Sequence, residues 1–479
     1  MYLENFYNIT SLQGSDVPLL ALLDAKEKRA RLQKKYCETY KKSVLSVTLV
    51  AMGGVKRNPL LDYVFKRALD RLNTLFQMLK IVPLAQSIQF LSTGHEAIFA
   101  LSIDPRLLKQ YCIEIEESLP LARLWDIDVI TPTGEILNRT DFYVPARTCL
   151  LCNENAKICA RTRKHALADL HNHMQNLVAQ DYLVEKLAYH ASDALVEEAC
   201  LTPKPGLVDA KNTGSHQDMN VRLLQQSARV LRPYFAKFIR FGQQTADLPI
   251  SEVLSRLRPL GIKAEEAMFL VTKGVNTHKG AVFSFGLVCT AIGRLSSTPN
   301  FWHHEHFFTL ENICTLVADM CQGITKELSE TRKQPITAGI TLFKQYGVKG
   351  ARGEAEAGFP LLRKYFSIFD KYQHLSFEHQ KFLFLLHLMH ENADTNILHR
   401  GGLDGLNFIQ QQAKSILDDN QIYHDLPYLK SRLEILDAQC MEKNLSAGGS
   451  ADLLALSIFL HALLRVNFDH SHQINFSEN

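Results

Sequence analysis

Residues 274–295 read Gly-Val-Asn-Thr-His-Lys-Gly-Ala-Val-Phe-Ser-Phe-Gly-Leu-Val-Cys-Thr-Ala-Ile-Gly-Arg-Leu, a polar motif followed by an apolar run. The apolar run, from Ala281 to Leu295, has the length and composition of a helix. Gly280 opens this helix, and the N-terminal amides of a helix favour an anion. The stretch therefore predicts a helix whose beginning faces an anionic ligand.

Four more polar motifs that contain or adjoin glycine stand between helical segments of the C-terminal half. They are Thr202–Asp209, Gly350–Glu356, Asp394–Asn396 with Arg400–Gly402, and Asn444–Asp452. Glycine lets backbone approach a ligand closely. The neighbouring Lys, Arg, Asp and Asn are side chains that hold phosphate or a hard metal ion. Their repetition predicts that several helix ends converge on one anionic ligand.

From about His165 onward, apolar spacing and length predict helices and no convincing strand. The predicted helices are 182–200, 219–240, 264–273, 281–295, 311–328, 377–392, 406–417 and 451–464. The connectors between them carry the polar motifs. This pattern predicts a large all-α domain over residues 181–479.

The first part of the chain mixes strand-like and helix-like runs. Strand-like runs cover 43–52, 87–91, 97–103 and 121–130, and apolar spacing predicts a helix over 60–79. The turn 131–134 would close a hairpin after the last strand, and Asp104 can cap a following helix. We therefore predict an α+β domain over residues 1–178, with a boundary near 170–181 inside a helical stretch.

Composition excludes several classes of protein. The 479 residues are 46% hydrophobic and 22% charged, with a net charge of +3, so nothing points to nucleic acid or to an acidic membrane. Residues 1–10 lack the features of a secretory signal, and no apolar run approaches the ~20 residues that span a bilayer. Ten cysteines in a chain of this length do not make a disulfide scaffold, so a cytoplasmic location is expected.

Two aspartates stand two residues apart in the predicted strand 121–130. Asp126 and Asp128 would point to the same face, where two carboxylates can share Mg²⁺ and neutralise a triphosphate, as in many nucleotidyl-transfer sites. The alternative is a strand with an acidic outer face. Arg123 is an odd number of residues from both aspartates, so on a regular strand it would point to the opposite face. It would need a β-bulge, or the length of its side chain, to reach the same ligand.

A cysteine and histidine cluster follows, with the spacing Cys149-x2-Cys152-x6-Cys159-x5-His165. Three thiolates and one imidazole can bind Zn²⁺ with four-coordinate geometry. The alternative is a group of reduced cysteines buried at a domain end. Both interpretations stay open on the sequence.

At this point the motifs resemble two known families. Residues 46–51, 93–97, 123–129 and 149–165 resemble the apo-citrate lyase phosphoribosyl-dephospho-CoA transferases, also called holo-citrate lyase synthases. Residues 181–465 resemble the triphosphoribosyl-dephospho-CoA synthases, with GVNTHKG, GARGEAEAG and GGSADLL unbroken. Departures from the usual pattern are Ala122 for glycine, Ala447 for proline and Ser215 for alanine. The chain thus looks like a bifunctional fusion of an α+β nucleotidyltransferase-type domain and an all-α synthase domain.

The resemblance implies two reactions. The C-terminal domain would join ATP to 3′-dephospho-CoA, with the 2′-hydroxyl displacing adenine from the ATP ribose. The N-terminal domain would transfer phosphoribosyl-dephospho-CoA to a serine of the citrate lyase acyl carrier protein, the γ subunit, and release pyrophosphate. The alternatives are the equivalent system for malonate decarboxylase and a non-catalytic protein that binds an acyl carrier.

The first reaction needs a triphosphate clamp, a base for the hydroxyl proton and help for the leaving adenine. The clamp candidates are Lys204, Lys279 and Arg352, with the amides after Gly280. The acidic candidates, for Mg²⁺ or as the base, are Asp209, Glu354, Asp394 and Asp452. The candidates for other polar contacts are Asn212, Asn276, His278, Asn396 and Arg400.

Asp209 and Asp394 look best for the metal, because each stands two or three residues from an Asn. For the second reaction we assign Asp126 and Asp128 to Mg²⁺ and Arg123 to phosphate. Each candidate also has a structural alternative, such as a helix cap for Asp452 or an Asx turn for Asp394.

Overall fold

The structure is a computed structural model that describes residues 8–297, 308–329 and 338–465. Its contacts divide the chain into two compact units, Met1–Leu183 and Val184–Asn479. Helix α6 (Leu167–Cys200) runs through the division without a break. The predicted domain boundary therefore falls inside a continuous helix.

The N-terminal unit is built on an antiparallel sheet of five strands in the order β2-β3-β1-β4-β5. The strands are β1 (Ser43–Leu49), β2 (Ala85–Leu91), β3 (Gly94–Leu101), β4 (Trp125–Ile130) and β5 (Ile136–Leu137). In the central pair, Ser46 lies opposite Asp128 and Thr48 lies opposite Asp126. The alternation of β4 places Trp125, Ile127 and Val129 in the core and leaves both aspartates on the other face.

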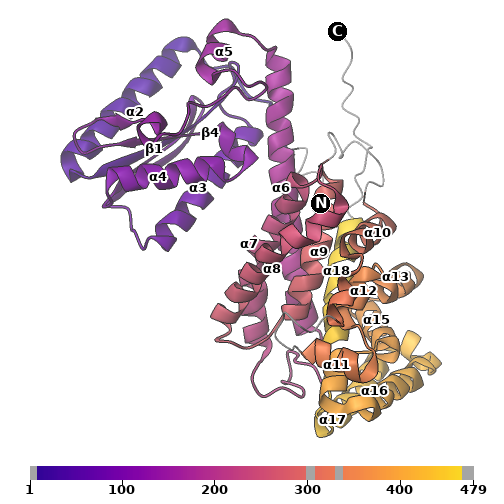
Figure 1. Cartoon of the computed structure of the whole chain (residues 1–479). Helices are drawn as coiled ribbons and strands as arrows, with labels where there is room; N and C mark the ends of the chain where they lie inside the picture. Colours follow the sequence, from indigo (N-terminus) through magenta and orange to yellow (C-terminus); the bar gives the residue numbers. More distant parts are fainter. Residues whose placement is uncertain (1–7, 298–307, 330–337, 466–479) are drawn as a thin grey trace. The chain divides into compact units, whose positions relative to one another are not determined.

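Helices cover both faces of this sheet (Figure 1). Helices α3 (Pro59–Met78) and α4 (Pro105–Glu117) pack on the apolar face, and each begins at a capping side chain, Asn58 and Asp104 respectively. Helix α2 (Leu19–Tyr40) covers part of the polar face. The sequence analysis did not predict α2, whose core-facing residues Leu32, Tyr36 and Cys37 lie in its second half, while most leucines of its first two turns are exposed.

The predicted strand 121–130 is wrong in its first half. Residues Pro120–Leu124 form a 3₁₀ helix, η1, and the strand begins only at Trp125. Proline at the first position favours this turn, and Leu121, Ala122 and Leu124 are buried by it. Arg123 therefore lies on a turn, and the parity that separated it from the aspartates does not apply. The unit continues with η2 (Arg139–Phe142) and α5 (Ala156–Thr162).

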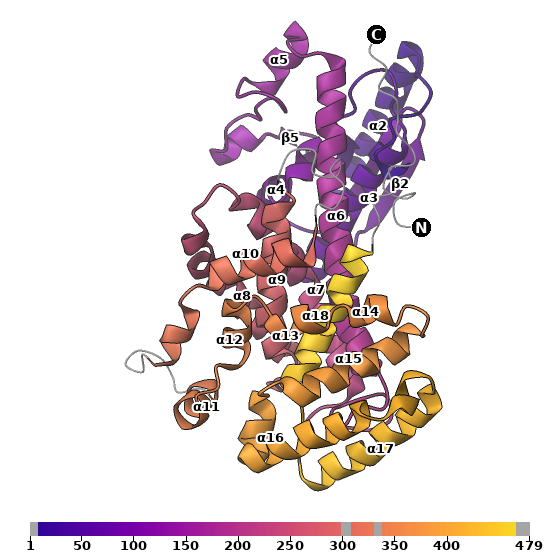
Figure 2. The same cartoon turned by 90° about the vertical axis from the view of Figure 1, so that its right-hand side faces the viewer.

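In the C-terminal unit, helices are the only regular secondary structure among the described residues. Its helices are α7 (Val221–Gln244), α8 (Ile250–Val271), α9 (Lys279–Leu295), α10 (Leu310–Cys321), η4 (Ile324–Leu328), α11 (Ala338–Tyr346), α12 (Gly350–Glu356), α13 (Pro360–Tyr365), α14 (Ile368–Lys371), α15 (Phe377–Glu391), α16 (Thr395–Leu417), η5 (Asn420–Tyr423), α17 (Leu426–Glu442) and α18 (Gly448–Leu464). Helix α18 packs against α9 and α15 in the middle of the unit (Figure 2). The predicted fold class, α+β followed by all-α, is confirmed.

Several predicted element boundaries differ from the structure. The motif 350–356, predicted as a connector, is helix α12 itself, and α17 was not predicted. The predicted helix 264–273 is only the end of α8, which continues through Pro259. The glycines of 400–402 lie inside α16, where Gly402 has φ 59° and kinks the helix. Most motif glycines thus begin or bend helices rather than separate them.

Close packing of α7 against α9 depends on two glycines. A Cβ atom at Gly242 would collide with the Thr290 carbonyl, and one at Gly293 would collide with the Ile239 carbonyl. The absence of side chains at both positions lets the two backbones approach. This contact fixes α9, whose first turn carries part of the candidate site. Among the described residues, no helix combines the length and apolarity needed to cross a membrane.

Candidate active sites

The C-terminal unit contains a cavity of about 720 Å³ where several helices begin. Its lining comes from the start of α9, α12, α16 and α18, the end of α6 and the loop after it. The predicted site residues that line it are Lys204, Asn276, His278, Lys279, Gly280, Arg352, Glu354, Asp394, Asn396, Arg400 and Asp452. Asp209 and Asn212 do not belong to the lining. Five separate motifs of the sequence therefore meet at one cavity.

Three carboxylates interact across this cavity. Burial raises the pKa of Asp452 well above its usual range, and the charges of Glu198 and Asp394 raise it further. Burial also raises the pKa of Asp394, against hydrogen bonds that hold its charged form. A cation bound among the three would offset this repulsion. Oxygen-rich, negatively charged sets of this kind suit Mg²⁺.

Asp394 also joins two helix ends. It caps α16 by accepting from the Asn396 amide at 2.9 Å, and it accepts from the amide and hydroxyl of Ser450 at 2.8 and 3.1 Å. Ser450 lies in the first turn of α18. The predicted Asx-type role and a role at the cavity are thus compatible in one residue.

The motif glycines make room for these acidic and amide side chains. A Cβ atom at Gly280 would collide with the carboxylate of Asp452, and one at Gly449 would lie 3.1 Å from Asp394 Oδ2. A Cβ atom at Gly448 would lie 2.7 Å from Asn396 Nδ2. The glycines were predicted to admit a ligand close to the backbone. The structure shows that they also admit the site's own side chains.

The three predicted cations differ in their environment. Lys204 is only 1% exposed, and its Nζ lies 2.5 Å from Glu198 Oε1. Lys279 is half-exposed and lies 3.1 Å from Glu265 Oε2, while Arg352 lies 3.7 Å from a carboxylate oxygen of Glu327. Lys204 is therefore a fixed buried charge. Lys279 and Arg352 make longer and more exposed ion pairs, in which an anion can replace the carboxylate.

One ring nitrogen of His278 is hydrogen-bonded, and the other has no partner among the described residues. Thr277 donates to the Ser227 hydroxyl at 2.8 Å, and that hydroxyl lies 2.8 Å from Nδ1 of His278. Burial and the charge of Lys204 lower the pKa of His278 to about 3, so the ring is neutral. Its buried Nε2 has no hydrogen-bond partner among the described residues. With Ser227 donating to Nδ1, Nε2 carries the proton and can donate it to a ligand.

Glu354 combines burial with an unsatisfied oxygen. Burial raises its pKa from 4.5 to about 7, and the Leu361 amide lowers it only in part. Its Oε2 is buried and has no hydrogen-bond partner among the described residues. A carboxyl group with a pKa near neutrality exchanges protons readily at physiological pH. Of the acidic candidates, Glu354 is thus the one whose environment suits a general base.

Asp209 and Asn212 hold the loop 202–214 together instead of lining the cavity. Asp209 accepts from the backbone amides of Lys204, Lys211 and Asn212 at 3.1, 2.7 and 2.9 Å. Asn212 donates to Asp437 at 2.9 Å and accepts from the Gly214 amide. Both carboxylate oxygens of Asp209 therefore accept from backbone amides, and its side chain lies outside the cavity where the other acidic candidates meet.

Arg400 fastens the same loop from α16. Its guanidinium donates to the Ser215 carbonyl at 2.7 Å and to the Asn444 side chain at 2.8 Å, and it lies 3.2 Å from His216 Nδ1. Asn276 also has a local role, because its side chain accepts from the Lys279 amide at 3.2 Å and supports the start of α9. These two residues line the cavity and organise its walls at the same time.

Sequence reasoning missed several lining residues. They include Glu198, Glu265, His216, Asn392 and Ser446. Glu198 lies in the last turn of α6, six residues before Lys204 and without a glycine beside it. Its one signal was an acidic residue that falls among the apolar positions of a predicted helix.

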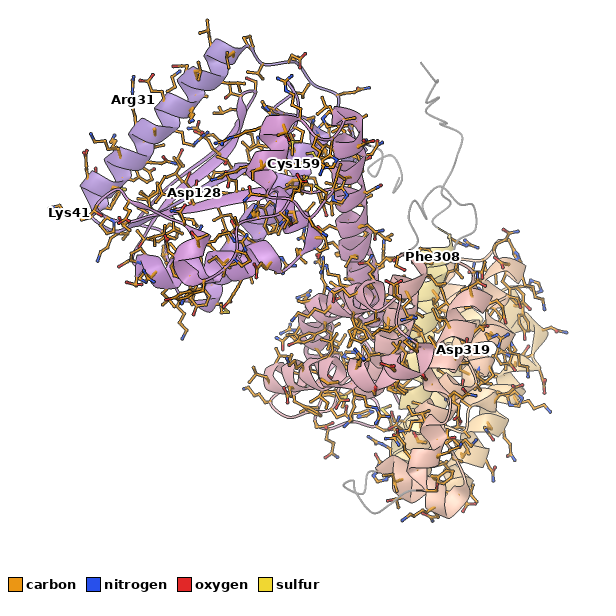
Figure 3. All side chains as sticks on the ribbon, turned by 45° about the horizontal axis from the view of Figure 1, so that its top comes forward. Arg31, Lys41, Asp128, Cys159, Phe308 and Asp319 are labelled. Atoms are coloured by element: carbon orange, nitrogen blue, oxygen red, sulfur yellow. The ribbon has the colours of Figure 1, made fainter. Side chains whose placement is uncertain are left out.

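The N-terminal unit presents a second candidate site on β4. Asp126 and Asp128 share the polar face of the sheet, and Thr48 Oγ1 donates weakly to Asp126 at 3.4 Å. Burial raises the pKa of Asp128, and the charge of Asp126 raises it further. Figure 3 labels Asp128 on this sheet. Two like charges so close favour a divalent cation between them.

Arg123 is held at the start of β4. Its guanidinium donates to the Thr148 carbonyl. Burial lowers its pKa, and the neighbouring charges of Arg147 and Arg139 lower it further. The three arginines thus concentrate positive charge near the start of β4, and guanidinium groups bind phosphate well.

The four residues of the cysteine and histidine cluster come together in the same unit. The ligand atoms of Cys149, Cys152, Cys159 and His165 all lie within 4.8 Å of one another. Nε2 of His165 lies 3.3 Å from Cys152 Sγ. The spacing of the sequence thus places four potential ligands in one group.

Comparison with known protein families gives two matches in chain order. The family described as apo-citrate lyase phosphoribosyl-dephospho-CoA transferase matches residues 17–181. The family described as ATP:dephospho-CoA triphosphoribosyl transferase matches residues 184–470. The two matches together span nearly all of the described residues.

Individual relatives show the same arrangement. Protein CitXG of Haemophilus influenzae is 51% identical over 458 residues, which cover 95% of this chain and 98% of that protein. Protein CitXG of Leuconostoc mesenteroides is 32% identical over 94% of this chain and 98% of its own length. The 2-(5''-triphosphoribosyl)-3'-dephosphocoenzyme-A synthase of Haemophilus ducreyi is 48% identical over 66% of this chain.

Proposed function

This chain belongs to the ATP:dephospho-CoA triphosphoribosyl transferase family, fused to an apo-citrate lyase phosphoribosyl-dephospho-CoA transferase domain, and we propose which residues serve each reaction. The protein makes the citrate lyase prosthetic group and attaches it. The C-terminal domain converts ATP and 3′-dephospho-CoA to 2′-(5″-triphosphoribosyl)-3′-dephospho-CoA and adenine. The N-terminal domain transfers phosphoribosyl-dephospho-CoA to a serine of the apo-citrate lyase acyl carrier protein and releases pyrophosphate.

In the C-terminal cavity, Lys204, Lys279 and Arg352 bind the triphosphate. The meeting of these cations with three carboxylates at one cavity is the observation that carries this proposal. Lys279 and Arg352 exchange their carboxylate partners for phosphate oxygens, while Lys204 supplies a fixed charge. The positive end of the helix dipole at the start of α9, where Gly280 lies, adds to this field.

Glu354 accepts the proton of the 2′-hydroxyl of dephospho-CoA. Its pKa of about 7 and its unpaired Oε2 support this role over the other acidic residues of the cavity. As the hydroxyl oxygen forms its bond to the ATP ribose, the hydroxyl proton moves to Glu354, and the bond to adenine breaks with its electron pair on the adenine nitrogen, which then takes up one proton. The neutral His278 donates from Nε2 to an acceptor atom of the bound substrates.

Mg²⁺ fits the donors of both sites. In the C-terminal cavity Glu198, Asp394 and Asp452 would hold it, and in the N-terminal unit Asp126 and Asp128 would hold it. Bound Mg²⁺ supplies neutralisation of triphosphate charge. Asp209 is not included, because it does not line the cavity, whereas Asp394 does. The cytoplasmic location predicted from the sequence stays a prediction.

In the N-terminal site, Arg123 orients the phosphate that the carrier serine attacks. The serine oxygen bonds to phosphorus and loses its proton to solvent, and the phosphorus–oxygen bond to the leaving pyrophosphate breaks. Asp126 and Asp128 keep this centre in place on a rigid strand. The family match over residues 17–181 favours the citrate lyase carrier protein over that of malonate decarboxylase.

The first experiment is adenine release by the purified protein with ATP, Mg²⁺ and 3′-dephospho-CoA, followed by mass spectrometry of the product. We expect one adenine for each triphosphoribosyl adduct formed. A folded protein that releases no adenine would favour a non-catalytic carrier-binding role. Transfer of the adduct to the citrate lyase carrier, with the malonate decarboxylase carrier as the comparison, then tests the second reaction.

A further inference from the structure

We infer that Cys149, Cys152, Cys159 and His165 bind one Zn²⁺ ion, and that this ion positions Arg123 and strand β4 for carrier loading. The zinc part rests on the cluster alone. The positioning part also rests on the roles proposed above for Arg123, Asp126 and Asp128.

The cluster has the geometry of a four-coordinate zinc site. Around a tetrahedral ion with Zn–S bonds of ~2.3 Å, sulfur atoms lie ~3.8 Å apart. The four ligand atoms here already lie within 4.8 Å of one another, so small rotations of the side chains suffice. Three thiolates and one neutral imidazole are ligands that zinc prefers.

The backbone around the cluster is shaped to hold these ligands. Thr148 pairs with Asn155 in an isolated bridge, and the Cys149 amide donates to the Glu154 carbonyl at 2.6 Å, so residues 147–156 form a tight hairpin. The Leu151 amide lies 3.5 Å from Cys149 Sγ, as a donor to a metal-bound sulfur does. Helix α5 ends at Thr162, and the next residue, Arg163, has a φ of 49° that turns the chain so that His165 faces Cys152.

Burial argues against the alternative of a simple cysteine core. Between residues 143 and 165 only Cys159 is buried, at 4% exposure, whereas the other three ligands are partly exposed. A segment this long with one buried side chain has too little apolar contact to order itself. A bound metal supplies the missing stabilisation, and it displaces the three thiol protons to solvent. Figure 3 labels Cys159 within this segment.

Two neighbouring residues of the hairpin, Arg147 and Thr148, contact strand β4 and the turn η1 that precedes it. The carbonyl of Thr148 accepts from Arg123, next to the zinc ligand Cys149. The guanidinium of Arg147 donates to the Trp125 carbonyl at 2.7 Å and pairs with Glu116 at 2.8 Å.

Glu116 continues this chain of contacts to the catalytic strand. It accepts from the Ile127 amide at 3.3 Å. Arg147 therefore holds β4 on both sides of Asp126: it bonds directly to Trp125, and it reaches Ile127 through Glu116. If the hairpin loosens, Arg123 loses its partner and β4 loses a brace beside its first aspartate.

The zinc content of the full chain, purified under reducing conditions, tests the site. We expect about one zinc ion per chain, and none in Cys159→Ser. Cys37→Ser is the matched control, because Cys37 is buried to the same degree in the same unit at 5% exposure and lies outside the cluster. A wild-type chain that holds no zinc and takes up no more added zinc than Cys159→Ser would overturn the site. Thiolate charge-transfer absorption after Co²⁺ replacement would identify sulfur ligands.

Carrier loading tests the positioning role. We expect that chelation of zinc slows loading of the carrier from pre-made triphosphoribosyl-dephospho-CoA by about tenfold or more, and that added Zn²⁺ restores it. Adenine release by the same sample is the internal control and should not change. Equal loading with and without zinc would refute the positioning role. The zinc site itself would still stand on the measured zinc content. A joint loss of both activities would also refute the positioning role. Failure of untreated protein to load the carrier would instead count against the proposed N-terminal site.

Discussion

In the N-terminal unit, Asp126 and Asp128 reach one site from a single strand, whereas in the C-terminal unit Glu198, Asp394 and Asp452 come from three helices far apart in the sequence. The first arrangement follows from the alternation of a strand, so it is local. The second depends on how α6, α16 and α18 pack, so it is a property of the whole unit. The two aspartates of the local site should stay together as long as β4 forms, so substitutions elsewhere should reach them only through the elements that brace this strand. The carboxylates of the convergent site should separate when residues that hold its walls are substituted.

The largest expected effect separates the two sites. Asp126→Asn should slow carrier loading by about a thousandfold or more, because it removes a ligand for Mg²⁺ and half of the negative charge on β4. Adenine release should remain unchanged. Loading of the carrier from pre-made precursor, measured by mass spectrometry, checks this. Asp24→Asn, on the surface of α2 and paired with Lys28, is the matched control. Parallel loss of adenine release would contradict two independent sites.

The reverse experiment addresses the convergent site. Arg352→Ala should lower adenine release by about a hundredfold to a thousandfold, because it removes a charged donor to the triphosphate. Added precursor should still load the carrier at the normal rate. Arg363→Ala is the control, since Arg363 pairs with Glu311 at 2.6 Å and does not line the cavity. Unchanged adenine release would remove Arg352 from the phosphate clamp.

A pH profile sharpens the assignment within the convergent site. The pKa of Glu354 is raised to about 7, and a base works only when ionised, so adenine release should rise as pH passes through about 7. Glu354→Gln should lower the rate by about a hundredfold and abolish this rise.

Two residues along α12, Glu356 accepts from the Gly323 amide at 2.8 Å and from Thr325, so it serves as the control. Glu356→Gln should affect stability but keep the pH profile. An unchanged pH profile in Glu354→Gln would assign the base to another carboxylate.

The same contrast explains what could be predicted from the sequence. The shared face of Asp126 and Asp128 follows from period-two alternation, so it was predicted correctly even though the strand begins only at Trp125. The convergence of five motifs was predicted from their composition. The sequence could not show which member of a motif faces the cavity. Asp209 and Lys204 stand in one loop, and only the packing of the helices decides that Lys204 lines the cavity and Asp209 does not. Glu198 was missed because its one signal, an acidic residue among the apolar positions of a helix, has no glycine motif beside it.

The smallest expected effect tests that distinction at Asp209. Asp209→Asn keeps one oxygen for the amides of Lys211 and Asn212 but places an amide group against the Lys204 amide, so one hydrogen bond is lost. The free energy of unfolding should fall by about 1–2 kcal/mol, and adenine release should fall less than about tenfold. Thermal denaturation and the adenine assay measure the two effects, with the exposed Asp404→Asn as control. A variant with normal stability and no adenine release would restore Asp209 as a metal ligand. The expected result makes Asp209 a residue that holds the wall of the cavity, as Arg147 holds the start of β4 in the N-terminal unit.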